Sequence, residues 1–513
     1  MRTDRRYHAA GAAASLPDRG SAARYTGPHA FVRLLAVNAP EASAATLVRL
    51  HELVARQRAA FERERHPPLD VRRDRLRRLL ALVREHEDAI AAAIDADFGG
   101  RSRHETRLAE LMVAANGVRD ALRDLPRWMK PQRVRTPLSL LPGRGEIRPQ
   151  PLGVVGIISP WNYPFQLAIV PATGALAAGN RVLLKPSELT PRTAALMADL
   201  VAKHFAEDEF AVVLGDADVG RAFAATRFDH LFFTGSTAVG RQVARAAAEN
   251  LVPVTLELGG KSPALVDEDA DFDVAVPRLV AGKLFNAGQT CIAPDYALVP
   301  EHRLEAFVAA VQAAIARFYP ALADNPDYTA IVNARHYRRL AGLVADARAQ
   351  GAAVIEVNPA RETLDEARRK FAPTLLTGVT PSMAVMQEEI FGPLLPVETW
   401  RSLDEALARM NARPRPLALY YFGERGARRD RVLREATAGG VTVNDTLYHF
   451  AHEDLPFGGV GDSGHGAYHG ERSFLTFSNE MGVFHQSRLS PARLLWPPYG
   501  GTFDRLLALL KRL

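Results

Sequence analysis

The sequence has very little cysteine: Cys291 is the only one among its 513 residues. A single cysteine cannot form an internal disulfide, which argues against a disulfide-stapled secreted protein and fits a reducing compartment such as the cytoplasm. The chain also lacks an apolar run that approaches the roughly 20 residues needed to span a bilayer. We therefore expect a cytoplasmic protein without stable membrane insertion.

The chain has no strong excess of charge of one sign. Its formal net charge of +6 arises from 64 basic and 58 acidic residues, which are mostly interspersed, so we expect no nucleic-acid partner. Hydrophobic residues make up 47% and charged residues 24% of the chain, as in an ordinary soluble globular protein. A length of 513 residues allows two or three domains.

The lone cysteine lies in a segment with other features of a reactive site. Residues 255–263 read TLELGGKSP and residues 286–294 read NAGQTCIAP, so Glu257 and Cys291 both lie beside glycine-bearing turns. An isolated cysteine in a large cytosolic chain is most often a small buried side chain. In this context, however, a thiolate would be a strong nucleophile, and a carboxylate near an apolar pocket would be a general base. We expect no metal site.

A second pattern begins at Pro151, where short apolar runs alternate with helical stretches. We predict strands at residues 153–158, 181–184, 210–214 and 230–233 and helices at residues 191–205 and 238–250. This alternation is typical of a doubly wound parallel sheet with its ligand at the carboxyl ends of the strands.

The loop TGSTAVG at residues 234–240 lies between a predicted strand and a predicted helix. Its backbone amides could approach a pyrophosphate at the start of the helix. The loop is not a G-x-G-x-x-G motif, and a two-glycine turn on its own is more often an ordinary turn between two elements than a ligand site.

The flanking regions have other patterns. Residues 1–45 lack sustained periodicity, so we predict a mobile tail there, and the pattern becomes helical from Thr46. The predicted elements that follow are a helical stretch at 76–94 that stops at Gly99-Gly100, a second at 105–125, and a connector or arm at 128–148. The C-terminal residues 503–513 either pack back onto the protein or associate with a membrane surface.

A second α/β region is predicted after Cys291. Its expected strands are at residues 296–299, 353–357 and 374–376, and its expected helices are at residues 301–318 and 334–350.

Over residues 47–499 the sequence resembles the aldehyde dehydrogenase superfamily. The resemblance is carried by the segments around Glu257 and Cys291, by the glycine loop, and by QEEIFGP at residues 387–393. The segment LPFGGVGDSGHG at residues 455–466 resembles the class 3 version, although Asp462 and His465 depart from its usual wording. The resemblance implies an α/β fold with an open parallel-sheet cofactor domain, an α/β catalytic domain and a small β oligomerisation arm.

The same resemblance implies a domain order and a homodimer. After the tail at 1–45 come a NAD-binding domain at 46–257, with a helical N-terminal part and an arm near 128–150, and a catalytic domain at 258–440. Residues 441–513 are expected to hold the return segment, the oligomerisation arm and the C-terminal tail. The implied dimer contacts are the arm near 128–150 and the segment after Gly482.

The resemblance also implies catalytic roles. Cys291 would attack the carbonyl of a small-molecule aldehyde, the thiohemiacetal would pass hydride to a nicotinamide, and Glu257 would activate the water that hydrolyses the thioester. Asn162, an amide that does not titrate, would form an oxyanion hole with the backbone N–H of Cys291, each donor being worth about 3 kcal/mol.

The cofactor implied is NAD, with NADP also possible. A carboxylate at Glu188, beside the adenosine ribose, prefers a free 2′-hydroxyl to a 2′-phosphate. The implied cofactor-binding residues are Ser159, Trp161, Lys185, Glu188, Gly235, Ser236, Gly240, Glu389 and Phe391.

Narrower features resemble the bacterial coniferyl aldehyde dehydrogenase branch. They are AAENLVPVT at residues 247–255, APDY at 293–296 and NDTLYHFAHED at 444–454. An aromatic slot would stack on a planar phenylpropenal, and its predicted members are Tyr163, Phe165, Tyr448, Phe450 and Phe457. A medium- or long-chain aliphatic aldehyde is the alternative substrate. An inactive binding protein and a thiol esterase without redox activity are the alternatives from other classes.

Overall fold

The computed structural model describes residues 41–511, and their side chains from residue 44 onward. Most of the predicted mobile tail therefore lies outside the described residues. The last residues of that tail belong to helix α2 (Glu41–Arg63), so the helical pattern begins earlier than the predicted start at Thr46. From Thr46 onward the chain forms one compact unit.

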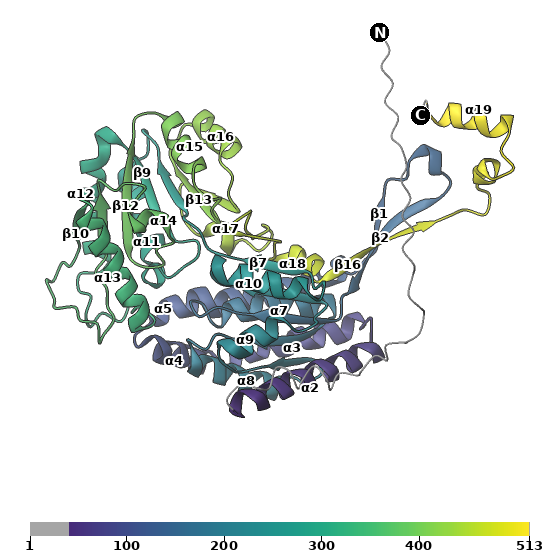
Figure 1. Ribbon diagram of the computed structural model, residues 1–513, viewed down its shortest axis with the longest axis horizontal. Coiled ribbons are helices and arrows are strands. Elements are labelled where there is room, and N and C mark those ends of the chain that lie inside the picture. Colours follow the sequence, from purple (N-terminus) through teal and green to yellow (C-terminus); the bar gives the residue numbers. More distant parts are fainter. Residues whose placement is uncertain (1–40, 512–513) are drawn as a thin grey trace, which may run out of the picture. The chain divides into compact units, whose positions relative to one another are not determined.

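The first large sheet has six strands in the order β15-β7-β6-β3-β4-β5 (Figure 1). In chain order they are β3 (Val154–Ile158), β4 (Arg181–Lys185), β5 (Phe210–Val212), β6 (His230–Thr234), β7 (Val254–Glu257) and β15 (Gly464–His465). All are parallel except β15, which comes from near the C-terminus and pairs with β7 in the antiparallel sense. The predicted doubly wound sheet is confirmed, whereas the edge strand β15 was not predicted.

Strand β3 lies between β4 and β6, so the chain winds outward from β3 in both directions. The carboxyl ends of β3 and β6 therefore form a topological switch point, which is where open α/β sheets bind their ligands.

Helices cover both faces of this sheet, because successive strand residues are apolar and point to opposite faces. On β3, Val155 belongs to the hydrophobic cluster with α7 (Gln166–Ala178), and Val154 belongs to the cluster with α9 (Ala217–Ala224) and α10 (Thr237–Ala248). The other helices of this part are α3 (Leu69–Glu85), α4 (Glu87–Phe98), α5 (Arg103–Thr106), α6 (Val113–Trp128), α8 (Pro191–His204) and α18 (Gly470–Thr476).

The N-terminal helices depart from the prediction in two places. The helical stretch predicted through residues 76–94 is two helices, α3 and α4, separated at His86. Helix α6 continues through Pro126 to Trp128, which is buried against Phe474 with ring centroids 5.8 Å apart. Trp128 therefore belongs to the core and not to the predicted connector. A π-helical segment, η1 (Arg107–Met112), joins α5 to α6.

The second large sheet has seven strands in the order β10-β11-β12-β9-β8-β13-β14, all parallel except β10. They are β8 (Pro263–Val266), β9 (Tyr296–Pro300), β10 (Ala353–Glu356), β11 (Thr374–Thr377), β12 (Leu394–Trp400), β13 (Ala418–Phe422) and β14 (Gly440–Val443). The flanking helices are α11 (Phe272–Leu284), α12 (Leu304–Phe318), α13 (Ala334–Ala349), α14 (Ala384–Gln387), α15 (Leu403–Asn411), α16 (Gly426–Glu435) and α17 (Tyr448–Ala451). This region follows the predicted pattern of strands and helices.

The register of the second sheet brings the two candidate catalytic segments together. Pro263 at the start of β8 pairs with Tyr296 at the start of β9. Immediately before these strands, the backbone N–H of Asp295 donates to the oxygen of Ser262 at 2.8 Å. The segments that lead into β8 and β9, and that carry Glu257 and Cys291, therefore run close together.

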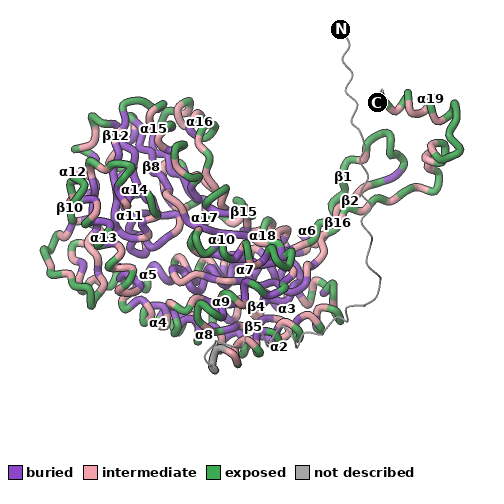
Figure 2. The backbone as a smooth tube through the Cα atoms, in the orientation of Figure 1, coloured by how far each residue is buried: buried purple, intermediate pink, exposed green. Residues whose placement is uncertain are grey.

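A three-stranded sheet of β1 (Gln132–Val134), β2 (Arg144–Pro151) and β16 (Ser478–His485) contains the predicted arm. β2 and β16 pair along their full length, and Figure 2 shows that both are far less buried than the strands of the two large sheets. The following helix α19 (Gly501–Leu510) has no buried residue, so the prediction that this segment packs back onto the protein is not met. Among the described residues, no helix is long and apolar enough to cross a membrane.

Candidate active site

The candidate nucleophile Cys291 follows a turn with unusual backbone geometry. Asn286, Ala287 and Gly288 have φ angles of 54°, 52° and 75°. This left-handed conformation costs on the order of 1–3 kcal/mol at each non-glycine residue. At Gly288 an added Cβ would lie 2.2 Å from the backbone oxygen of Gly392, so only glycine fits. Such a turn persists only where surrounding contacts hold it, and here it directs the backbone into Cys291.

Cys291 is partly exposed as a residue, and its thiol lies within electrostatic reach of two carboxyl groups. Burial of the sulfur, followed by the charges of Glu389 and Glu257, raises the pKa of the thiol to about 12. The backbone N–H groups of Cys291 and Ile292 oppose this rise. The sulfur and both carboxyl groups therefore lie close enough to influence one another, and burial keeps the thiol protonated at neutral pH.

Glu257 is the last residue of β7 and is only 2% exposed. Neither of its carboxyl oxygens has a hydrogen-bond partner among the described residues. Burial raises the pKa of this carboxyl well above its usual value, because the charged form loses its solvation. Once this carboxyl group has lost its proton, the carboxylate is a stronger base than an exposed one and can accept a proton from water.

The glycine-rich segment 455–466 lies directly against Glu257. Gly464 pairs with Glu257 across the edge of the sheet, and the backbone N–H of Leu258 donates to the oxygen of Ser463 at 3.1 Å. At Gly464 φ is 126°, and a Cβ would lie 1.9 Å from the backbone oxygen of Leu256. This glycine therefore permits a close approach of two backbones, which is a structural role and not phosphate binding.

Asn162 lies in the loop between β3 and α7 and is 3% exposed. Its Nδ2 donates to the backbone oxygen of Gln289 at 3.1 Å, two residues before the candidate nucleophile. An asparagine amide carries two N–H bonds, so this contact leaves one of them for another acceptor. The structure thus brings Asn162, Cys291 and Glu257 together from three separate parts of the chain.

Several predicted cofactor residues lie at the carboxyl ends of the first sheet. Ser159 follows β3, Lys185 ends β4, and Gly235 follows β6. Ser236 caps α10 by accepting a hydrogen bond from the backbone N–H of Val239. At Gly240 a Cβ would lie 2.5 Å from the side chain of Leu258, so this glycine allows α10 to pack closely beside β7. This is the arrangement that a dinucleotide site requires at a switch point.

The polar groups at this edge fit a dinucleotide. The hydroxyl oxygens of Ser159 and Thr234 and one carboxyl oxygen of Glu389 are buried without a hydrogen-bond partner among the described residues. Such atoms are costly to bury unless a ligand or water satisfies them. Lys185 is buried and its Nζ donates to Glu188 at 3.0 Å, whereas the side chain of Glu188 is 43% exposed. Glu188 is therefore free to adjust to a ribose.

A buried ion pair positions the loop that carries Glu389. Lys261 and Asp295 pair directly, and Lys261 also donates to the backbone oxygens of Val385 at 2.8 Å and Glu388 at 3.1 Å. The backbone N–H of Ile390 donates to Asp295 at 3.0 Å. The sequence analysis did not select this pair, because only the register of β8 against β9 brings the two residues together.

Two aromatic residues that are predicted to bind the cofactor contact each other. Trp161 lies edge-on to Phe391 with ring centroids 5.3 Å apart and lies 5.0 Å from the ring of His336. His336 was not selected from the sequence, and both of its ring nitrogens are buried without a hydrogen-bond partner in the described part of the chain.

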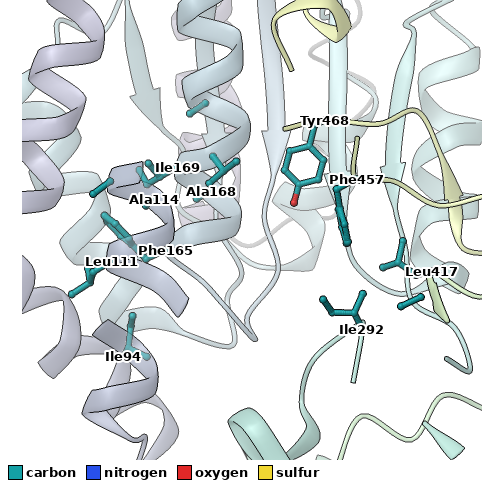
Figure 3. Packing of buried hydrophobic residues seen from close by; sticks show 14 of the residues in the cluster. Ile94, Leu111, Ala114, Phe165, Ala168, Ile169, Ile292, Leu417, Phe457 and Tyr468 are labelled. Carbon is teal, nitrogen blue, oxygen red and sulfur yellow. The ribbon is translucent and has the colours of Figure 1, made fainter. Parts of the chain in front are cut away.

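The predicted substrate slot is only partly assembled. Phe450 and Phe457 contact each other at 4.8 Å between centroids. Phe165 instead packs in the core beside α7, as Figure 3 shows, Tyr448 is 64% exposed, and the hydroxyl of Tyr163 bonds that of Thr290 at 2.7 Å. Contact of any of these five with a substrate stays a prediction.

Three residues that the sequence analysis did not select complete the aromatic cluster. His449 and His469 stack on Phe457 at 6.0 and 5.4 Å, and Tyr468 lies edge-on to Phe457 at 5.7 Å. Burial, followed by the charges of Glu257 and Cys291, raises the pKa of Tyr468, so this ring lies within electrostatic reach of the nucleophile. In the view of Figure 3 its phenol oxygen points toward Ile292. A buried tyrosine or histidine has no spacing signal that separates it from ordinary core.

Comparisons with known proteins identify the family of this chain. The sequence pattern of the aldehyde dehydrogenase family matches residues 37–483. A probable coniferyl aldehyde dehydrogenase of Pseudomonas aeruginosa is 52% identical over 458 residues, which cover 89% of this chain and 95% of that protein. The coniferyl aldehyde dehydrogenase of a Pseudomonas species is 50% identical over 445 residues, covering 86% of this chain and 92% of that protein.

A solved structure shares the fold. The substrate-bound state of Staphylococcus aureus AldH matches with a TM-score of 0.85 at 40% identity, covering 90% of this chain and 99% of that chain. This likeness confirms the predicted fold class.

The contribution of Glu257 to the thiol pKa can be measured. Replacing Glu257 by Gln removes a negative charge near the sulfur, so we expect the pKa of the Cys291 thiol to fall by about 1. Because Cys291 is the only cysteine, the pH dependence of alkylation by iodoacetamide reports on this thiol alone. Glu480→Gln, on the exposed arm, is the matched control and should leave the midpoint unchanged. An unchanged midpoint in Glu257→Gln would mean that the two groups do not interact.

Proposed function

This chain belongs to the aldehyde dehydrogenase family, and we propose that it oxidises an aromatic enal such as coniferyl aldehyde to the carboxylic acid. It is an oxidoreductase that uses a nicotinamide cofactor. One observation best supports the proposed mechanism: Asn162 bonds to the turn that leads to Cys291, and Glu257 lies within electrostatic reach of the Cys291 sulfur.

Cys291 carries the first step in this proposal. The thiol loses its proton, the sulfur bonds to the aldehyde carbon, and the carbonyl oxygen becomes negative. The free N–H of the Asn162 amide and the backbone N–H of Cys291 would donate to that oxygen. A preorganised donor of this kind is worth roughly 100-fold to 1,000-fold in rate. The turn at residues 286–288 supports this role because it fixes the backbone that leads to the nucleophile.

Glu257 serves the second half of the reaction. A bound nicotinamide cofactor would supply the hydride acceptor that oxidation of the aldehyde requires. The residues that would hold this cofactor are Ser159, Trp161, Lys185, Glu188, Gly235, Ser236, Gly240, Glu389 and Phe391. Glu257 would then take a proton from the water that attacks the thioester. Its raised pKa and its carboxyl oxygens, which make no bond to described protein groups, support this role.

An aromatic substrate is supported by the cluster around Phe457. Phe457 contacts both Phe450 and Tyr468 edge-on, and Tyr468 lies within electrostatic reach of the nucleophile. Aromatic faces and edges of this kind favour a planar conjugated ring by about 1 kcal/mol per contact beyond the area that is buried. Two relatives that align with this chain over most of their own length are about half identical to it, and both are named for coniferyl aldehyde.

A substrate panel tests the proposal. Purified protein with NAD should reduce the cofactor fastest with coniferyl aldehyde, more slowly with benzaldehyde and decanal, as followed by absorbance of the reduced nicotinamide. Cys291→Ala should abolish this activity and the hydrolysis of 4-nitrophenyl acetate, because both need the same sulfur. A clear preference for decanal would contradict the aromatic substrate, and ester hydrolysis without any cofactor reduction would favour a thiol esterase.

We infer that NAD is the preferred cofactor and that Glu188 sets the preference. Replacing Glu188 by Gln removes a carboxylate that would repel a 2′-phosphate, so kcat/KM with NADP relative to NAD should rise by about tenfold, or about 1.4 kcal/mol. Glu249→Gln, an exposed charge removal at the end of α10, is the control. An unchanged ratio in Glu188→Gln would exclude this carboxylate from cofactor selection.

We also propose a cytoplasmic homodimer. The exposed sheet of β1, β2 and β16 offers apolar side chains such as Val134 and Phe484, which are 44% and 47% exposed, for a second copy to cover. The lone cysteine nucleophile suits a reducing compartment.

A further inference from the structure

A fully buried arginine lies behind the candidate oxyanion donor. The side chain of Arg101 has no exposed area, and its Nη1 donates to the backbone oxygen of Asn162 at 2.6 Å. The guanidinium lies over the rings of Phe98 at 4.7 Å and Tyr163 at 4.8 Å. Its nearest carboxyl oxygen is Oε1 of Glu110, at 3.7 Å. Arg101 therefore holds the backbone of Asn162, the candidate oxyanion donor.

Glu110 fixes the other end of the same loop. Its Oε2 accepts hydrogen bonds from the backbone N–H groups of Phe165 at 3.0 Å and Gln166 at 2.7 Å, where α7 begins. These donors are among the unsatisfied amides of a helix start, and a carboxylate there is favoured by the helix dipole. The loop that carries Asn162 is thus held by a cation at one point and by an anion at another.

A second buried carboxyl group holds the turn before Cys291. Oε2 of Glu105 accepts from the backbone N–H of Asn286 and from the hydroxyl of Thr329, both at 3.0 Å. Asn286 is the first left-handed residue of the turn. Its strained conformation therefore has a specific partner that satisfies its N–H group.

The two held segments are linked directly to each other. Nδ2 of Asn286 donates to the backbone oxygens of Asn162 and Gln289, both at 3.1 Å. Nδ2 of Asn162 donates to the same oxygen of Gln289. The Gln289 side chain in turn donates to the backbone oxygen of Ala330 at 3.0 Å and accepts from the N–H of Val332 at 2.9 Å. The loop of Asn162 and the turn of Cys291 therefore form one hydrogen-bonded unit.

Burying these charged groups costs free energy, and a gain in folding stability does not account for their presence. Burial raises the pKa of Glu105 and of Glu110 to about 7, although the Arg101 charge opposes the rise in both. Apolar residues of similar volume often replace buried ion pairs without loss of stability. What such replacements would lose here is directional bonding to two backbone groups, the oxygen of Asn162 and the N–H of Asn286.

We propose that Arg101 and Glu105 are positioning residues that hold the Asn162 amide and the Cys291 turn in the register needed for carbonyl attack. The proposal rests on the function proposed above, but it concerns groups that touch neither substrate nor cofactor. Arg101 acts through the backbone of Asn162, and Glu105 acts through the backbone of Asn286. A displacement of about 1 Å at a reacting group is enough to cost on the order of 100-fold in rate.

A double-mutant cycle separates positioning from general stability. Arg101→Met should lower kcat by about 10-fold to 100-fold while KM changes less than about 3-fold, because the lost contact acts on the transition state. When Asn162 is already replaced by Ala, Arg101→Met should lower kcat by less than about a further 3-fold, because the amide through which Arg101 acts is no longer present. Arg103→Met removes an exposed arginine at the start of α5, two residues after Arg101, that pairs with Asp88; it is the matched control and should retain wild-type kcat.

Glu105 gives a second test that does not depend on how Arg101→Met folds. Glu105→Ala should lower kcat by about 10-fold, whereas Glu105→Gln should restore most of it, because the amide oxygen still accepts from Asn286 and Thr329. All variants are compared well below their thermal midpoints. Wild-type kcat in Glu105→Ala, no rescue by Glu105→Gln, or an equal loss from Arg101→Met with and without Asn162 would overturn the proposal.

Hydrolysis of 4-nitrophenyl acetate keeps this test separate from the proposed function. That reaction also passes through sulfur attack and a negative oxygen, and it needs no cofactor. If the wild-type protein oxidised no aldehyde, the proposed function would fail, yet the same cycle measured on the ester would still decide the roles of Arg101 and Glu105.

Discussion

The left-handed turn at residues 286–288 is the constraint on which the active site depends. Two non-glycine residues in this conformation cost together a few kcal/mol, which is a sizeable part of the net stability of a folded protein. The surrounding contacts offset that cost. Gly288 packs against the backbone of Gly392, and the N–H of Asn286 is bonded by Glu105. The turn is therefore a product of tertiary structure, and it sets where the sulfur of Cys291 lies.

The electrostatics of the site follow from the same packing. Burial raises the pKa of the Cys291 thiol, of Glu257 and of Glu389, so in the resting protein all three groups tend to hold their protons. Each becomes reactive only when a proton is taken away, and a thiolate or carboxylate formed in this poorly solvated space is a strong nucleophile or base.

Local sequence patterns predicted much of the fold. The apolar runs of β3, β4 and β6 and the glycine loop before α10 are encoded within a few residues, and they appear where the alternation indicated. The segments that carry Glu257 and Cys291 were found because their sequences resemble those of a known family. The predicted helix ended at residue 125, whereas helix α6 continues to Trp128, which packs against Phe474.

Long-range contacts account for what the sequence did not reveal. Strand β15 joins a sheet formed some 200 residues earlier, and Lys261 meets Asp295 only through the register of β8 and β9. Glu105 and Glu110 stood in a predicted helical stretch, and Arg101 stood just before it, with no spacing that marks these charged residues as buried. Their partners are backbone groups of distant turns, which no local pattern specifies.

The central claim is that one sulfur and one carboxyl group act in sequence on the same carbonyl carbon. Rapid mixing of Glu257→Gln with NAD and coniferyl aldehyde tests it most directly, with reduced nicotinamide as the readout. The account predicts a burst of reduced cofactor close to one per active site, followed by turnover slowed by about 100-fold or more, because attack and hydride transfer survive while hydrolysis fails. Loss of the burst together with turnover would contradict it, since Glu257 would then be needed before the thioester forms.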